Sequence, residues 1–419
     1  MKRLINTNGV KPEPRSLSKG ESDSSEVRRS ILGRRSFLKG LGATGAMLLP
    51  ATSLLARKAK SDDSGGKLSK GDASILRFLC AAEILESDLW ELGGNQMPDF
   101  ASKNPATGVA PTPTGGNAPY TNGLLILDGD MPQYIQDNTD DEFSHAKFLL
   151  AYLKSKGANT ADLDVLVGTQ FRTLPGSMAT GSTKKGRLTN LTQLTIDTSF
   201  WGRYRTDNKN PDLDPNFKFA EPVPSLNVGR HTAIPRTDVD SNNKNLITAI
   251  AFTAGFHFAF IEVGGTSLYP ALAQRVSDPE VLRILLSIGP TETMHFQTWQ
   301  DKAGNANTNP NGPPGNPDFT VVDSVNNSTV TFKDLHFLQP PSETLQANLI
   351  MPEPCPFLNR KFPICSIIRP TNTKGAAMGA AAGLTADGLF IGQTKPFFDL
   401  IKDLGADADR ARSEFEGEN

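Results

Sequence analysis

The sequence has no excess of positive charge. Its 43 lysines and arginines are offset by 45 aspartates and glutamates, which leaves a formal net charge of −2 and a pI near 6.3. A chain without surplus positive charge attracts neither nucleic-acid phosphates nor anionic lipid headgroups strongly. We therefore predict no nucleic-acid partner, and a small-molecule or metal function fits the composition better.

Cysteine is scarce, with 3 residues in 419. Cys355 and Cys365 lie close enough in sequence to close a small loop as a disulfide if the protein reaches an oxidising compartment. Cys80 lies one helical turn before Glu83, and we expect it to be a buried free thiol rather than a metal ligand.

The N-terminal region lacks a long, strongly apolar run. Residues 40–56 are mildly apolar, rich in glycine and alanine, and interrupted by Pro50, whereas a bilayer span needs about 20 strongly apolar residues. The segment Arg34-Arg35-Ser36-Phe37-Leu38-Lys39 precedes this run and resembles a twin-arginine export signal. The resemblance implies that residues 1–60 are a signal and a disordered N-terminus, that the export machinery is a partner, and that the protein is periplasmic or secreted. No clean cleavage site is present.

The spacing of apolar residues predicts a mainly α-helical protein with four long helices. These helices are expected over residues 70–92, 132–156, 244–268 and 278–303. Pro270 is expected to end the third helix, and Pro290 is expected to kink the fourth. Together the helices define a four-helix bundle over residues 70–304, interrupted by long insertions at 97–122 and 158–243.

The insertions and the C-terminal extension have less regular patterns. Residues 97–122 are rich in proline, glycine and asparagine and predict a surface loop. The crossing segment 158–243 predicts a short helix near 160–171 and extended structure around 188–205. The extension 305–419 predicts a small β-hairpin that pairs residues 320–322 with 330–332 and a final helix near 396–412. We expect this extension to pack against the bundle.

Two of the five histidines follow a glutamate by three residues, as Glu142 with His145 and Glu292 with His295. Residues i and i+3 lie on one face of a helix, so each pair offers a carboxylate and an imidazole to a common metal. Lone glutamates occur on the other two predicted helices, at Glu83 and Glu262.

In chain order these residues give Glu, Glu-x-x-His, Glu, Glu-x-x-His, which is the pattern of a ferritin-like di-iron or di-manganese carboxylate bundle. Four buried glutamates would repel one another, and two divalent cations would neutralise them. Oxygen ligands with one histidine per ion favour iron or manganese over zinc or copper. The predicted metal ligands are Glu83, Glu142, His145, Glu262, Glu292 and His295.

Several assignments have alternatives. Glu142 stands in an acidic run that is also typical of a solvated helix N-terminus, although the matching pair at Glu292 argues for the metal. Glu86 lies on nearly the same stripe as Glu83 and is either an additional ligand or a group beside the site. Asp141 either accepts a hydrogen bond from a ligating histidine or faces solvent. The other histidines, His231, His257 and His336, have no partner at ligand spacing.

The motif order, the segment from Asp141 to His145 and the Glu83-x-x-Glu86 segment resemble the bacterial ferritin-like domain family, which includes exported proteins and plant desiccation-related relatives. The resemblance covers residues 70–157 and 244–304, and residues 186–205 resemble an insertion of one exported branch. It implies that Glu142 and Glu292 bridge two metals while Glu83 and Glu262 bind one metal each. It also implies aromatic neighbours seven residues after each lone glutamate, at Trp90 and Tyr269.

These observations predict an exported dinuclear metal protein. Its leading function is redox chemistry with dioxygen or peroxide, as iron oxidation, peroxide removal or oxidation of an organic substrate. Two alternatives stay open: a manganese catalase-like enzyme, and a non-catalytic stress-related or structural protein that binds metal to stabilise its fold. An oligomer is compatible with the sequence, but the long insertions argue against a cage-type storage shell. The sequence does not name the substrate.

Overall fold

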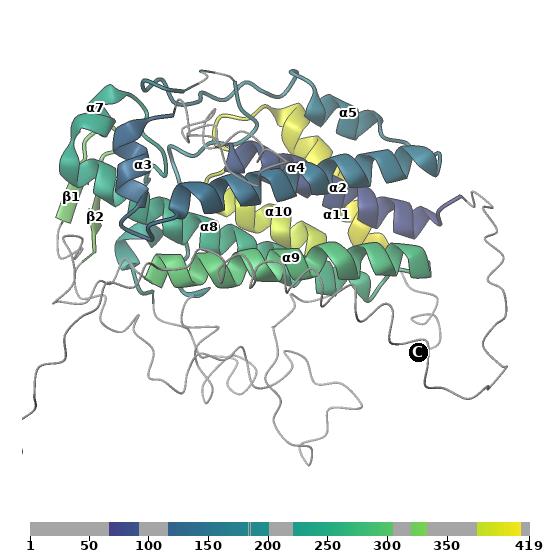
Figure 1. The fold of residues 1–419 in the computed structure, drawn as a ribbon. Coiled ribbons are helices and arrows are strands. Elements are labelled where there is room, and N and C mark those ends of the chain that lie inside the picture. Colours follow the sequence, from purple (N-terminus) through teal and green to yellow (C-terminus); the bar gives the residue numbers. More distant parts are fainter. Residues whose placement is uncertain are drawn as a thin grey trace, which may run out of the picture. The chain divides into compact units, whose positions relative to one another are not determined.

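The computed structural model describes residues 67–91, 116–182, 184, 186–200, 221–304, 320–332 and 375–411. Within these ranges the protein is mainly helical and has one small two-stranded antiparallel sheet (Figure 1). The predicted predominance of helix is therefore confirmed. Some sequence predictions fall outside the described residues: the export signal, residues 97–115 of the first insertion, residues 201–205, His336, Cys355 and Cys365.

Four long helices correspond to the four that the apolar spacing predicts. They are α2 (Lys70–Trp90), α4 (Met131–Ser155), α8 (Lys244–Ala273) and α9 (Pro279–Gly304). Helix α2 packs along α4, and α8 packs along α9 (Figure 1). Polar side chains define two of the starts, because Ser69 accepts a hydrogen bond from the Asp72 N–H and Asn243 accepts one from the Leu246 N–H.

Helix α8 does not end at Pro270 as predicted but continues to Ala273. A proline inside a helix removes one backbone hydrogen bond. The turn beyond Pro270 nevertheless buries Ala271 and Leu272 completely, and this burial offsets the missing bond. Helix α9 is likewise one helix through Pro290.

Helix α8 is also the most apolar of the long helices that the structure describes. By length and composition it could cross a membrane, but 83% of its most apolar stretch is buried inside the protein. A helix that is apolar on all sides is typical of the centre of a large core, and its position there accounts for the composition of α8.

Shorter elements form the described parts of the two insertions. They are α3 (Ala118–Leu124), α5 (Ala161–Val167), the 3₁₀ helix η1 (Pro224–Asn227) and α7 (Asp238–Asn242). The end of the first insertion is therefore helical rather than a loop, because Asn117 caps α3 and the helix buries Tyr120 and Leu124. The extended structure expected around 188–205 forms no strand within the described residues. Leu194 makes an isolated bridge with His231, and a second isolated bridge joins Leu174 to Arg187 just before this range.

One buried carboxylate ties the crossing segment to α2. Asp88 accepts hydrogen bonds from the backbone N–H groups of Leu188 and Thr189, at 3.1 and 2.9 Å. The guanidinium of Arg172 also donates to Asp88, and buried Arg187 donates to its backbone oxygen. Because an unpaired buried carboxylate is costly, these donors fix the segment in one position against the helix.

The predicted β-hairpin and the packing of the C-terminal extension are confirmed for the described residues. Strand β1 (Thr320–Asp323) pairs with β2 (Ser328–Thr331), with Val321 opposite Val330. Helix α10 (Ala376–Ala386) packs on α8, and α11 (Lys395–Arg410) packs on α2. Two further helices thus pack against the long helices, and they also pack on each other.

Candidate metal centre

The six predicted ligands come together from the four long helices. Helix α2 contributes Glu83, α8 contributes Glu262, and α4 and α9 each contribute a Glu-x-x-His pair. The side chains of a pair project from one face because three residues are close to one helical turn. All six residues are buried, with exposed fractions of 0–9%.

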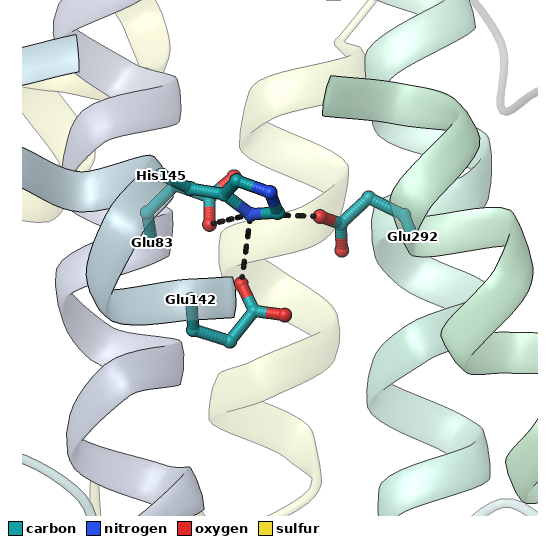
Figure 2. Close-up of side chains that lie close together, drawn as sticks. All are labelled: Glu83, Glu142, His145 and Glu292. Atoms are coloured by element: carbon teal, nitrogen blue, oxygen red, sulfur yellow. Dashed lines mark hydrogen bonds and ion pairs between the residues drawn. The ribbon is translucent and has the colours of Figure 1, made fainter. Parts of the chain in front are cut away.

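The first group of ligand atoms surrounds His145. Its Nδ1 atom lies 3.3 Å from Glu83 Oε2, 3.3 Å from Glu142 Oε2 and 3.5 Å from Glu292 Oε1 (Figure 2). One ring nitrogen cannot make three good hydrogen bonds at once. Adjacent ligand atoms around an ion with bonds of about 2.1 Å are about 3 Å apart in octahedral geometry, so this spacing suits an ion between them.

The second group surrounds His295. Its Nδ1 atom lies 3.0 Å from Glu142 Oε1 and 3.4 Å from Glu262 Oε2. Glu292 completes the group, and all its ligand atoms lie within 4.8 Å of one another, as they also do in the first group. Each group therefore contains three carboxylates and one imidazole.

Glu142 and Glu292 belong to both groups, whereas Glu83 and Glu262 belong to one each. The two oxygens of Glu142 face different histidines, Oε2 toward His145 and Oε1 toward His295. Among the described residues, neither oxygen of Glu262 or Glu292 makes a hydrogen bond, although both side chains are fully buried. Buried polar atoms normally have partners, so this donor set fits divalent cations better than it fits a dry core.

Burial and mutual repulsion raise the pKa of three glutamates. The pKa of Glu83 rises to about 8, chiefly because the side chain is buried and also because Glu142 lies close. Burial raises the pKa of Glu262 to about 7, although His295 opposes the change, and raises that of Glu292 well above its ordinary value. Without cations, these carboxyl groups hold protons near neutral pH.

The pKa shifts of the two histidines and of Glu142 instead favour the charged form of each side chain. Burial lowers the pKa of His145, but hydrogen bonds to Glu142 and Glu83 outweigh it and raise the pKa to about 10. The pKa of His295 is raised as well, since the charge of Glu262 and the contact with Asp141 outweigh burial. Burial tends to raise the pKa of Glu142, yet its contacts with both imidazoles lower it overall. Glu142 therefore stays a carboxylate at the centre of the site.

Two of the predicted neighbours contact the ligands directly. The Tyr269 hydroxyl donates a hydrogen bond to Glu83 Oε1. Asp141 Oδ2 lies 3.1 Å from Nε2 of His295, the nitrogen that faces away from the other ligands. Both contacts orient a ligand, and a carboxylate on the outer nitrogen of a ligating histidine also makes that ligand more basic.

The remaining candidates lie outside the two groups. Trp90 stacks on Phe258 at a centroid distance of 4.2 Å and also contacts Trp299. His231 and His257 are buried away from the site, where His231 Nε2 faces backbone oxygens and His257 Nδ1 lies 3.2 Å from Asp387. Cys80 is a buried free thiol, as expected.

Glu86 belongs to neither group of ligand atoms. It lies one turn beyond Glu83 on α2 and lines a cavity of about 280 Å³ beside the centre. Burial raises its pKa well above the ordinary value, with Glu142 and Glu83 as further causes. Glu86 is therefore electrostatically linked to the centre without facing either histidine.

Two glycines that the sequence reasoning did not single out allow α8 and α9 to approach closely. A Cβ atom at Gly265 would lie 2.5 Å from Glu292 Oε2, and one at Gly289 would lie 2.8 Å from the Cβ atom of Tyr269. The only signal in the sequence is a glycine within an apolar helical pattern, which often marks close packing but does not name the neighbour.

Comparison with known proteins gives no relative for this chain. No protein-family model, no curated protein and no solved structure matches it. The class that the fold and the site define is a mainly helical protein in which buried glutamates and histidines lie within metal-binding distance of one another.

Proposed function

We propose that this chain is an exported, ferritin-like protein that binds two iron or manganese ions and uses them for redox chemistry with dioxygen or peroxide. The observation that carries the proposal is the sharing of Glu142 and Glu292 between two groups of ligand atoms. Two separate mononuclear sites would not need common carboxylates. Four helices that contribute Glu, Glu-x-x-His, Glu and Glu-x-x-His form the pattern of dinuclear carboxylate bundles.

The charges of the buried groups support two cations rather than one. Glu83, Glu142, Glu262 and Glu292 carry up to four negative charges in a buried region. Two divalent ions neutralise these charges, and neutral imidazoles complete the ligand sets. When bound, such a pair of ions supplies the electrons that reduce dioxygen or peroxide. The chain holds Glu83 in place through Tyr269 and orients His295 through Asp141.

The cavity beside the centre supports a reactive role over a purely structural one. A metal that only stabilises the fold needs no space for another molecule, whereas an enzyme site needs a concave pocket with a few polar groups. Glu86 and Gly265 line this cavity of about 280 Å³, and Gly265 lies directly against Glu292. Iron oxidation, peroxide removal and oxidation of an organic substrate are all compatible with this arrangement.

A non-catalytic metal-binding protein is the second candidate. The nearly complete burial of all six ligands favours it, because a sealed ligand set is typical of metals that stabilise a fold. Reactivity separates the two candidates. The metal-loaded protein should be reduced anaerobically and mixed with dioxygen or hydrogen peroxide. Rapid oxidation of the ions supports the redox proposal, and a centre that stays reduced supports the second candidate.

Metal analysis of isosteric variants tests the shared ligands. We expect about two ions per unaltered chain, as in other dinuclear carboxylate bundles. Glu142→Gln and Glu292→Gln should lose both ions because each residue serves both groups, whereas Glu83→Gln and Glu262→Gln should each lose one. Glu280→Gln is the control, since this exposed glutamate lies on α9 and pairs with Lys156. Only trace metal in the unaltered chain, or full metal content in Glu142→Gln, would contradict the proposal.

The export part of the proposal rests on the Arg34-Arg35 motif. Twin-arginine export carries folded proteins, so the centre would be loaded before the chain leaves the cytoplasm. Replacement of both arginines by lysine should retain the protein in the cytoplasm with its metal bound, and cell fractionation would measure this. Export of the doubly substituted chain in unchanged amount would contradict this part of the proposal.

A further inference from the structure

Residues from four helices line the cavity beside the centre. Its walls include Phe78 and Leu85 from α2, Phe260 from α8, Leu384 from α10 and Ile401 from α11. Among the described lining residues, Glu86 and Ser267 alone have polar side chains. A volume of about 280 Å³ is near the lower end of the range for small-molecule sites, about 300–1,000 Å³. The site therefore suits a mostly apolar molecule.

Three glycines keep the cavity open. A Cβ atom at Gly264, Gly379 or Gly383 would meet no atom within 4 Å, so none of them is required by close packing of two backbones. Glycine destabilises a helix relative to alanine, and all three lie within helices. All three line the cavity, and because Gly264 and Gly379 are also exposed, the cavity is open to the surface beside them.

The cavity also touches the candidate centre. Gly265 lines it and lies directly against Glu292, because a Cβ atom there would be 2.5 Å from Glu292 Oε2. Glu86 lines it from α2, one turn from Glu83. A molecule in the cavity would thus have one end next to the carboxylates and the rest against apolar walls.

We propose that this cavity binds an elongated apolar molecule, an alkyl chain or a hydrophobic ring, with a neutral hydrogen-bonding end such as an alcohol that lies beside Glu86. An anionic end is disfavoured because the one acidic side chain among the described lining residues, Glu86, would lie beside it, and because apolar walls do not solvate a charge. That this molecule is the substrate of the centre rests on the proposed function. The binding itself does not require a metal.

Fluorescence binding tests the cavity in the full-length purified protein. The probe is 1-aminoanthracene, an uncharged aromatic molecule, and the competitors are 1-decanol and decanoate, each below its solubility limit. We expect saturable binding of one probe per chain and displacement by decanol. Decanoate should compete about tenfold less well, because its charge would have to enter an apolar site lined by an acid. No saturable binding, or equal competition by decanoate, would overturn the proposal.

Variants that fill the cavity locate the bound probe. Gly383→Leu from α10 and Gly264→Leu from α8 each place a side chain into the open volume, and each should weaken probe binding about tenfold by overpacking. Ala382→Leu is the matched control, because this exposed residue lies on α10 and does not line the cavity; binding should stay within about twofold. Circular dichroism should be unchanged in all three. Unweakened binding in both filled variants would overturn the proposal.

The role of Glu86 and the role of the metal are tested on the same preparations. Glu86→Gln removes the acid and should reduce the preference for decanol over decanoate to about threefold or less. Metal-free protein should bind the probe as metal-loaded protein does. If the chain binds the probe but takes up no iron or manganese, the proposed function fails and the cavity proposal stands. If it takes up metal but does not bind the probe, the cavity proposal fails.

Discussion

At the scale of single residues, we expect metal binding to depend also on residues that are not ligands. Gly265 and Gly264 are neighbours on α8 with opposite surroundings, since a Cβ atom at Gly265 would lie 2.5 Å from Glu292 Oε2 and one at Gly264 would meet nothing within 4 Å. Overpacking typically costs about 1–3 kcal/mol. Gly265→Ala should therefore weaken metal binding about ten- to a hundredfold. Isothermal titration would measure this loss.

The neighbouring glycine is the control for that substitution. Gly264→Ala should leave metal binding unchanged and stabilise the helix by up to about 1 kcal/mol, because alanine favours a helix over glycine. Equal metal affinity in the two alanine variants would contradict the close contact between Gly265 and Glu292.

Asp141 should matter through His295 rather than as a ligand. Its Oδ2 atom lies 3.1 Å from His295 Nε2. Asp141→Ala should lower the affinity of the ion held by His295 by about 10–100-fold, the usual effect of removing such a partner. Asp140→Ala is the matched control, because Asp140 is exposed and accepts a hydrogen bond from Gln136 on the same helix. Metal titration that shows equal affinity in the two variants would contradict this role.

Sequence reasoning predicted the six residues that the structure brings together but not the residues that surround them. Glu142 and Glu292 could be found because helical spacing places each beside a histidine, and Glu83 and Glu262 because they complete the pattern. Gly265 could not be found, because its importance comes from a contact with a residue on another helix. The position of Glu86 at the cavity depends likewise on how α10 and α11 pack.

At the scale of elements, local signals predicted where the long helices and the β-hairpin lie. Prolines mark the starts of α4 and α9, and Asp278 also accepts a hydrogen bond from the Glu280 N–H at the start of α9. Runs of threonine and valine mark β1 and β2. The end of α8 was predicted too early, since the local cost of Pro270 is offset by burial of the turn beyond it. Tertiary packing decides such boundaries, and local sequence signals do not predict that packing.

The crossing segment should depend on Asp88 for its attachment to α2. Asp88→Ala would leave buried Arg187 without its carboxylate and two backbone N–H groups without an acceptor. We expect a loss of about 3–5 kcal/mol in the free energy of unfolding, measured by denaturant titration. The control is Asp162→Ala, which removes the half-exposed partner of Arg77 and should cost less than about 1 kcal/mol. Similar losses in the two variants would contradict the attachment.

At the scale of the whole molecule, the buried acids link folding, protons and metal. The pKa of Glu83 is raised to about 8 and that of Glu262 to about 7, both from 4.5, chiefly by burial. Between pH 4.5 and pH 8 the folded, metal-free protein therefore binds more protons than the unfolded chain. Stability must then fall as the pH rises through this window. Cations that replace the protons remove the penalty, and their binding strengthens as the pH rises.

Thermal unfolding at several pH values checks this linkage. The melting temperature of metal-free protein should fall between pH 5 and pH 8, while that of the loaded protein should change much less. The stabilisation by metal should thus grow with pH over the range in which Glu83 and Glu262 ionise. A metal-free protein that becomes more stable from pH 5 to pH 8 would contradict the raised pKa of these acids.

The sequence by itself determined which residues are able to hold metal and which segments are helical. Both are local properties, since helical periodicity and i, i+3 spacing depend on neighbours along one chain. The family resemblance implied that Glu142 and Glu292 are shared, and the tertiary structure places both in the two groups of ligand atoms. Only the tertiary structure decided that Gly265 lies against Glu292 and that a cavity lies beside Glu86. These features depend on distances between helices that are far apart in the chain, and packing rather than spacing sets those distances.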